Sequence, residues 1–182
     1  MSLIRQAFIM VAVKVKIMQP KRVYLESSVI SYLTARPAKD MRRLVKQRIT
    51  KEWWKRRDEY DLFISQTVVD EIGRGDAEAA SLRLEAILGI PRLSHLEIVN
   101  ALVHAFLLSE AVPSNYAEDA FHIAIAAVHQ MDIILTWNQK HIANPRKLEA
   151  INSIIRGFHL TPLLVLTPEQ LLEMESCDHE TD

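Results

Sequence analysis

Short apolar runs alternate with longer amphipathic stretches along the chain. The runs have the length of buried strands and occupy residues 22–26, 61–65, 91–94, 132–136 and 162–166. Between them, the pattern predicts helices over residues 27–35, 38–58, 67–75, 76–88, 95–110, from Pro113 onward, within 138–157, and from Thr167 onward. Strands that alternate with helices predict an α/β fold, in which a central parallel sheet is covered by helices on both faces.

Local signals mark the ends of some of these helices. Ser27 or Ser28 is placed to cap the first helix, because a serine hydroxyl accepts from free amide groups there. The last helix has Thr167 as its cap and Gln170 in the capping-box position. No strand is followed by a glycine-rich turn, which argues against a dinucleotide site and a P-loop.

The length and composition of the chain limit the number of domains and the kinds of disulfide or metal site it can contain. The chain has 182 residues, enough for one domain with a sizeable core. Cys177 is the lone cysteine, so an intrachain disulfide and a cysteine-based zinc site are excluded. The expected compartment is a reducing cytoplasm.

Charge is distributed unevenly along the chain. Residues 1–60 contain 15 lysines and arginines and 5 acidic residues, whereas residues 61–182 contain 7 and 18, although the net charge is only −1. This split predicts either a basic surface that binds a polyanion or two halves that neutralise each other in the fold.

We divide the chain into three parts. Residues 1–20 form an N-terminal extension, which is non-native or upstream if Met18 is a second start. Its apolar run, residues 7–13, is shorter than the ~20 residues that cross a bilayer, so no membrane association is expected. Residues 21–175 form the domain, and residues 176–182 form a polar tail.

Polar side chains lie near the predicted carboxyl ends of several strands. Glu26 ends the first strand, Asp70 and Glu71 follow the second, Asp119 precedes the fourth, and Asn138 follows it. Ligands of open parallel sheets bind at this edge, where the strand order reverses. Crowded carboxylates repel each other unless a cation binds them, and oxygen ligands favour Mg²⁺ or Mn²⁺. The pattern therefore predicts metal-assisted phosphodiester hydrolysis.

Each of these residues also has a structural explanation. Glu26 can be solvated or ion-paired, Asp119 can complement a helix dipole, and Asn138 can shape a turn. Asp70 and Glu71 point in different directions on a helix, so at most one of them faces the site. His122 and His141 can be ligands, substrate contacts or hydrogen-bonded core groups.

Three segments resemble the PIN-domain family, in the branch of VapC-type toxins of bacterial toxin–antitoxin pairs. These are YLESSVISYLTA (residues 24–35), SQTVVDEIGRGD (residues 65–76) and EDAFHIAIAAVHQMDIILTWNQKHIAN (residues 118–144), and the likeness extends over residues 22–175. It implies a PIN-like three-layer α/β/α sandwich and an Mg²⁺- or Mn²⁺-dependent endoribonuclease. The implied partners are RNA, an antitoxin and a second copy of the chain.

The resemblance assigns the metal and catalytic quartet to Glu26, Glu71, Asp119 and Asn138. Family members usually have aspartate at the position of Glu26 and often at that of Asn138. The longer Glu26 side chain puts nuclease activity in doubt, because Mg²⁺ demands near-ideal geometry. The alternatives are a PIN-fold module that binds nucleic acid or protein without cleaving it, and, less well supported, a phosphatase, which needs an aspartate where Glu26 stands.

Contacts with RNA are predicted on the long helix and at the site. Basic residues there attract phosphates without reading the base sequence. The predicted set is Arg42, Arg43, Lys46, Arg56, Arg57, His122 and Trp137. Burial of Trp137 against the sheet is the alternative to base stacking. The pair Trp53 and Trp54 can serve a dimer or antitoxin interface.

Overall fold

Five parallel strands form the centre of the protein. The computed structural model describes residues 20–140, 142 and 144–179. The strands are β1 (Arg22–Leu25), β2 (Asp61–Ser65), β3 (Arg92–Leu93), β4 (Ile133–Leu135) and β5 (Leu164–Leu166). Their order in the sheet is β3-β2-β1-β4-β5, and every neighbouring pair is parallel.

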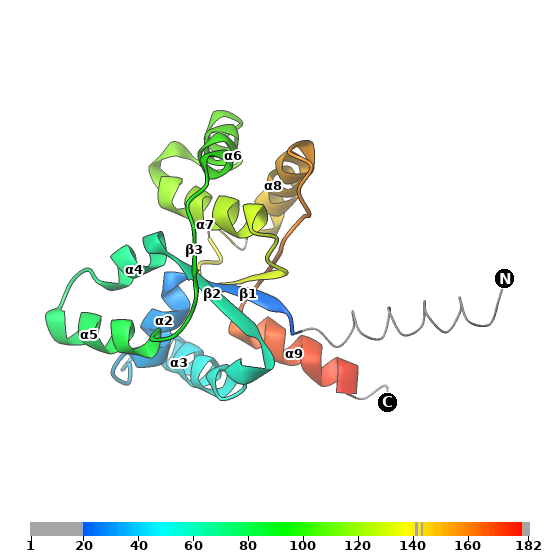
Figure 1. The fold of residues 1–182 in the computed structure, drawn as a ribbon. Coiled ribbons are helices and arrows are strands. Elements are labelled where there is room, and N and C mark those ends of the chain that lie inside the picture. Colours follow the sequence, from blue (N-terminus) through cyan, green and yellow to red (C-terminus); the bar gives the residue numbers. More distant parts are fainter. Residues whose placement is uncertain (1–19, 141, 143, 180–182) are drawn as a thin grey trace.

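Helices cover both faces of this sheet, as Figure 1 shows. They are α2 (Ser27–Thr34), α3 (Met41–Trp54), α4 (Gln66–Ile72), α5 (Ala77–Ala86), α6 (Glu97–Leu108), α7 (Ala117–Val128), α8 (Pro145–Gly157) and α9 (Pro168–His179), with 3₁₀ turns η1 (Arg57–Glu59) and η2 (Ser114–Tyr116). One layer contains α6, α7 and α8, and the other contains α2, α3, α5 and α9. The predicted three-layer α/β/α sandwich is therefore confirmed.

The strand order reverses beside β1. The chain proceeds from β1 to β2 and β3 on one side, and then returns to place β4 on the other side of β1. Helix α4 contacts α2 from one layer and α7 from the other, which places it beside this switch point. Crossovers of opposite direction leave a crevice at the carboxyl ends of adjacent strands, where ligands of such sheets bind.

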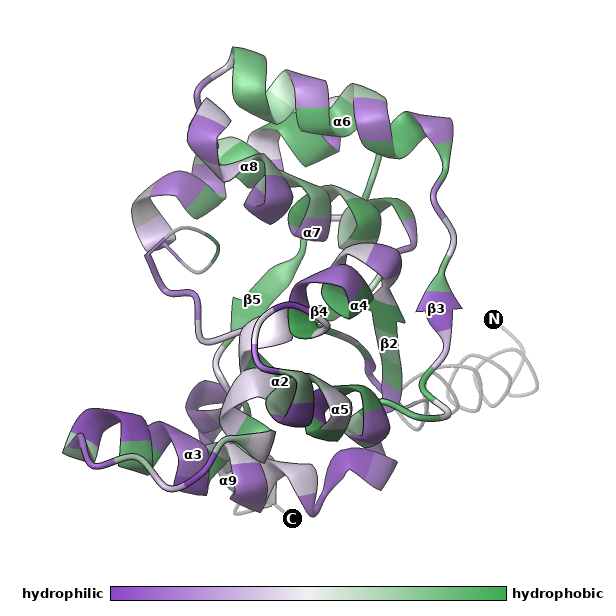
Figure 2. Ribbon diagram, turned by 90° about the vertical axis from the view of Figure 1, so that its left-hand side faces the viewer, coloured by the Kyte–Doolittle hydropathy of each residue, from purple (hydrophilic) through white to green (hydrophobic). Residues whose placement is uncertain are grey.

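The core consists of the strands and the inner faces of the helices. In Figure 2, β2 and β5 are drawn largely in green, as hydrophobic residues, and α3 carries many purple residues. Val23, Tyr24 and Leu25 of β1 are fully buried, which agrees with a central strand covered on both faces. Among the described residues, no helix combines the length and the apolar character needed to cross a membrane.

Most predicted elements lie within a few residues of their observed bounds, but two details differ. Ser27 and Ser28 do not cap α2, whose N-cap residue is Glu26 without a capping hydrogen bond from its side chain. The expected polar tail begins inside a helix, because α9 extends to His179.

At the start of α9, the capping box is present: the backbone amide of Gln170 donates to Oγ1 of Thr167, and the backbone amide of Thr167 donates to Oε1 of Gln170. The predicted extension over residues 1–20 lies outside the described residues except for Pro20.

Candidate functional site

Glu26 lies at the switch point, directly after β1. Only 5% of the residue is exposed, so its carboxylate is removed from water. Three hydroxyl groups donate to it: Ser27 at 2.8 Å, Thr136 at 2.7 Å, and Ser28. Hydrogen bonds of this kind offset much of the cost of burying a charge. The carboxylate is therefore fixed in position at the carboxyl ends of β1 and β4.

Glu71 projects towards Glu26 from α4. Its neighbour Asp70 is exposed and accepts a hydrogen bond from Gln66 at 2.8 Å, so Glu71 is the member of the acidic pair that faces the site. The Ser27 hydroxyl, which donates to Glu26, is also among the groups that favour the ionised form of Glu71.

His122 from α7 completes this inner group. It is 1% exposed, and its Nε2 lies 3.1 and 3.2 Å from the two carboxylate oxygens of Glu71. One ligand atom each from Glu26, Glu71 and His122 can be chosen so that all three lie within 4.8 Å of one another, and the three side chains could hold a metal ion. The sequence analysis considered His122 as a possible ligand but placed it among the predicted RNA contacts and not in the metal quartet. The available signal was its position three residues after Asp119, on the same face of a helix.

Asp119 and Asn138 are joined beside this group. Nδ2 of Asn138 donates to Oδ1 of Asp119 at 3.0 Å, so the amide orients the carboxylate. Burial, together with the negative charges of Glu26 and Glu71, raises the pKa of Asp119 to about 6. Asp119 therefore interacts electrostatically with Glu26 and Glu71. A hollow of about 220 Å³, lined by η2 together with Asp119 and Glu118, opens next to it.

His122 stabilises the negative charge of Glu71, and Glu71 stabilises the positive charge of His122. Burial opposes ionisation of both groups. For Glu71, the hydrogen bond and positive charge of His122 outweigh this effect and hold its pKa below the usual range. For His122, the hydrogen bond from its ring to Glu71, with the charges of Glu26, Glu71 and Asp119, raises its pKa. The cluster thus carries excess negative charge, which is the electrostatic condition for binding a cation.

Two of the residues predicted to contact RNA are buried. The ring of His122 contacts Tyr24 and Glu71, which argues against a contact between His122 and RNA. Trp137 is 6% exposed, and its Nε1 donates to Thr50 at 2.8 Å. Trp137 is thus buried, as the alternative to base stacking expected, and its side chain contacts Tyr32 of α2 and Lys46 and Thr50 of α3. His141, the other histidine considered, lies outside the described residues.

The basic residues of the long helix differ in their surroundings. Arg42 and Arg43 are exposed on α3. The ammonium group of Lys46 lies 4.9 Å from the ring centre of Trp137 and 5.6 Å from that of Tyr32, as a cation–π contact. These three positions can present positive charge to a polyanion.

Arg56 and Arg57 have other contacts. Arg56 forms ion pairs with Glu59 at 2.8 Å and with Glu175 at 2.9 Å, which argues against a contact between Arg56 and RNA. Arg57 lies over the ring of Trp54, with its guanidinium carbon 5.5 Å from the ring centre. The pairing of Arg56 with Glu175 of α9 shows that the basic and acidic halves of the chain partly neutralise each other.

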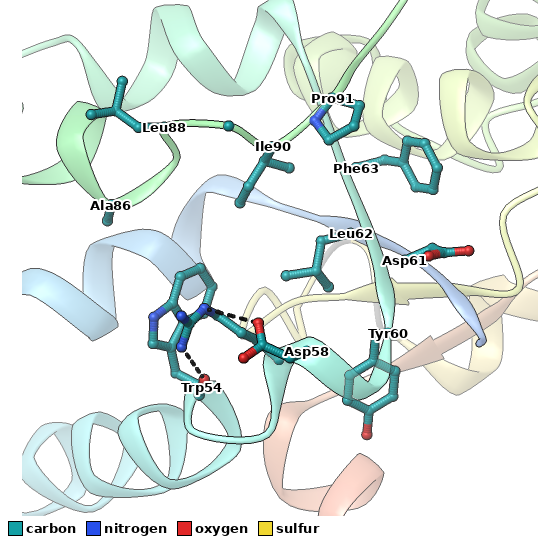
Figure 3. A pocket seen from close by; sticks show the side chains of 12 residues that line it. Trp54, Asp58, Tyr60, Asp61, Leu62, Phe63, Ala86, Leu88, Ile90 and Pro91 are labelled. Carbon is teal, nitrogen blue, oxygen red and sulfur yellow. Dashed lines mark hydrogen bonds and ion pairs between the residues drawn. The ribbon is translucent and has the colours of Figure 1, made fainter.

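A second hollow, of about 450 Å³, lies at the opposite end of the sheet (Figure 3). Leu62 and Phe63 of β2 line it together with Ile90 and Pro91 before β3. It lies at the amino end of β2, whereas ligands of parallel sheets bind at the carboxyl ends. The acidic group is thus at the expected end, and this hollow, which Arg57, Asp58 and Asp61 also line, is separate from it.

Comparisons of the chain with protein-family models and with curated proteins found no match. The resemblance to PIN-domain proteins therefore remains a prediction from the quoted sequence segments.

Proposed function

We propose that this protein is a metal-dependent endoribonuclease that hydrolyses phosphodiester bonds in RNA. The observation that carries the proposal is the meeting of Glu26 and Glu71 with His122, from three separate elements, within reach of one cation. Asp119, which is joined to Asn138, interacts electrostatically with these two carboxylates. The position of the cluster at the switch point of a parallel sheet supports a functional role rather than a purely structural one.

The chemistry of the donor set fits a divalent cation. Carboxylate and amide oxygens are ligands of Mg²⁺ and Mn²⁺, and His122, whose two ring nitrogens contact Tyr24 and Glu71, would support the Glu71 ligand rather than bind the cation itself. Glu26 is longer than the aspartate of the PIN family, but three hydroxyl donors fix its carboxylate and so limit the rotamers available to it. We propose Mg²⁺ or Mn²⁺ as the cofactor.

The site residues would have separate roles in binding the cation and the RNA. A bound divalent cation supplies an activated water molecule and neutralises charge that develops on the phosphate. Glu26 and Glu71 would hold it, and Asp119, oriented by Asn138, would complete its coordination. Exposed Arg42 and Arg43, with Lys46, would attract the RNA backbone.

Cleavage of a fluorescently labelled RNA with Mg²⁺ or Mn²⁺ tests this function. We expect the wild-type protein to cut the RNA, EDTA to stop the reaction, and Glu71→Gln and Asp119→Asn to reduce the rate by at least about 100-fold. Asp70→Asn is the matched control, because Asp70 is adjacent to Glu71 but exposed and bonded to Gln66. Equal cleavage by wild type and Glu71→Gln would contradict the proposal.

A specific observation favours a second candidate, a module that binds RNA or protein without cutting. Glu26 is buried and its oxygens already accept three hydrogen bonds, as expected for a structural carboxylate. The same assay separates the candidates. RNA binding without cleavage under either cation would support the module.

The resemblance to VapC-type toxins supports a biological role. We propose that the chain acts in the cytoplasm as the toxin of a toxin–antitoxin pair, as a homodimer that an antitoxin neutralises. Induced expression should arrest growth, and Asp119→Asn should relieve the arrest. Normal growth at a confirmed level of wild-type protein would argue against the toxin role, but not against cleavage of RNA.

A further inference from the structure

A buried chain of hydrogen bonds leads from the start of α4 to Glu71. The amide of Val68 donates to Oγ of Ser65, the N-cap residue of α4, at 3.4 Å. Oγ of Ser65 lies 2.7 Å from the hydroxyl of Tyr24, which lies 2.8 Å from Nδ1 of His122. Nε2 of His122 then contacts the carboxylate of Glu71.

This chain connects three elements that approach the site from different directions. Tyr24 belongs to β1, Ser65 ends β2, and His122 belongs to α7. All three side chains are at most 1% exposed, so water does not compete for their hydrogen bonds. A buried polar network that is fully satisfied is rigid, because breaking any link leaves a costly unpaired group.

Packing alone does not explain the hydroxyl of Tyr24. A phenylalanine would fill almost the same space in the core, and the hydroxyl is tolerated there because Ser65 and His122 bond to it. Tyr60 offers a comparison within the same chain. It is also buried, but its hydroxyl has no hydrogen-bond partner among the described residues.

We propose that Tyr24 and Ser65 are positioning residues of the nuclease site, which act through His122 to hold the Glu71 carboxylate where the cation binds. Tyr24 fixes the ring of His122 through Nδ1, and the opposite nitrogen fixes Glu71. In metal sites, outer partners that orient a ligand affect metal affinity by about 10- to 100-fold. The inference rests on the proposed function, because it assigns Glu71 to a metal ion.

Histidine-selective ¹⁵N NMR and Mn²⁺ titration of the full chain test the proposal together. In Tyr24→Phe, we expect the two ring nitrogens of His122 to change their chemical shifts and the Kd for Mn²⁺ to rise about 10-fold. Ser65→Ala should act in the same direction, and the double variant should be little worse than Tyr24→Phe, because both act through one chain. Tyr60→Phe, a matched removal of a buried hydroxyl, should leave both readouts at wild-type values.

The outcomes distinguish this proposal from the function on which it rests. Unchanged His122 shifts and an unchanged Mn²⁺ affinity in folded Tyr24→Phe would overturn the positioning role. If Tyr24→Phe does not fold, the same results for Ser65→Ala would overturn it. A wild-type protein that binds no Mn²⁺ would overturn the metal site itself, and the NMR comparison would still decide whether Tyr24 orients His122.

Discussion

The hydroxyl of Thr136 donates a 2.7 Å hydrogen bond to the carboxylate of Glu26, across 110 positions of sequence. The two residues follow β4 and β1, the neighbouring strands between which the direction of the crossovers reverses. The backbone amide of Asn138 in turn donates to Oγ1 of Thr136 at 2.8 Å. Thr136 therefore ties together Glu26 and the loop that carries Asn138.

Thr136→Val should lower the stability of the protein and its affinity for Mn²⁺, while a side chain of nearly the same shape stays in place. The substitution leaves a buried carboxylate with one donor fewer, which should lower the free energy of unfolding by about 2 kcal/mol and raise the Kd for Mn²⁺. Urea unfolding and Mn²⁺ titration measure the two effects. Thr136→Ser keeps the hydroxyl and should bind Mn²⁺ almost as wild type does. Wild-type stability and affinity in Thr136→Val would show that this hydrogen bond contributes little.

Mn²⁺ binding should depend on pH through Asp119. Its pKa is raised to about 6, so the carboxyl is mainly protonated at pH 5 and mainly ionised at pH 7.5. Only the ionised form binds a cation, so affinity should rise with pH and be about tenfold weaker at pH 5 than at pH 7.5. Calorimetric titrations at both values measure this. Asp119→Asn should lose most of the difference, and a pH-independent wild-type affinity would contradict the assignment.

Trp137 should matter for stability and not for RNA contact. Trp137→Phe removes the hydrogen bond from Nε1 to Thr50 and some core volume, which should cost about 1–3 kcal/mol of unfolding free energy. Because the ring is buried, the Kd for single-stranded RNA should stay within about twofold of wild type. Filter binding at low temperature, where the variant remains folded, provides the measurement. A large loss of RNA affinity in a folded variant would restore base stacking as its role.

The exposed arginines of α3 should contribute to RNA binding through charge alone. Arg42→Gln and Arg43→Gln should each reduce the slope of log affinity against log salt concentration by about 1. Arg56→Gln is a control beyond the C-terminal end of α3, since Arg56 is already paired with Glu59 and Glu175, and it should leave the slope unchanged. If all three variants behave alike, ion pairing does not decide which arginines bind RNA.

The sequence was enough to predict the strands of the sheet, but not the orientation of every side chain at the site. Apolar runs such as residues 61–65 have few alternatives to a buried strand, and the observed bounds of β2 are the same. Parallel strands then bring Glu26 and Asn138 to one edge without any knowledge of their contacts. The orientation of Glu71 rather than Asp70 towards the site depends on the axial rotation of α4, which the short helix leaves undetermined.

The serines after β1 show why local rules failed at the site. Ser27 and Ser28 match the pattern of helix caps, but α2 already begins at Ser27, and both hydroxyls donate to the buried carboxylate of Glu26. Similarly, His122 has the pattern of a core residue on an apolar helix face. Its contact with Glu71 depends on the packing of α7 against α4, which a single sequence does not reveal.

Anomalous diffraction from crystals soaked in Mn²⁺ tests most directly whether these side chains form one cation site. We expect a peak within coordinating distance of carboxylate oxygens of Glu26 and Glu71, next to Asp119, and its loss in crystals of Glu71→Gln. Ordered density for all three side chains with no anomalous peak among them, at Mn²⁺ concentrations that support RNA cleavage, would contradict the account.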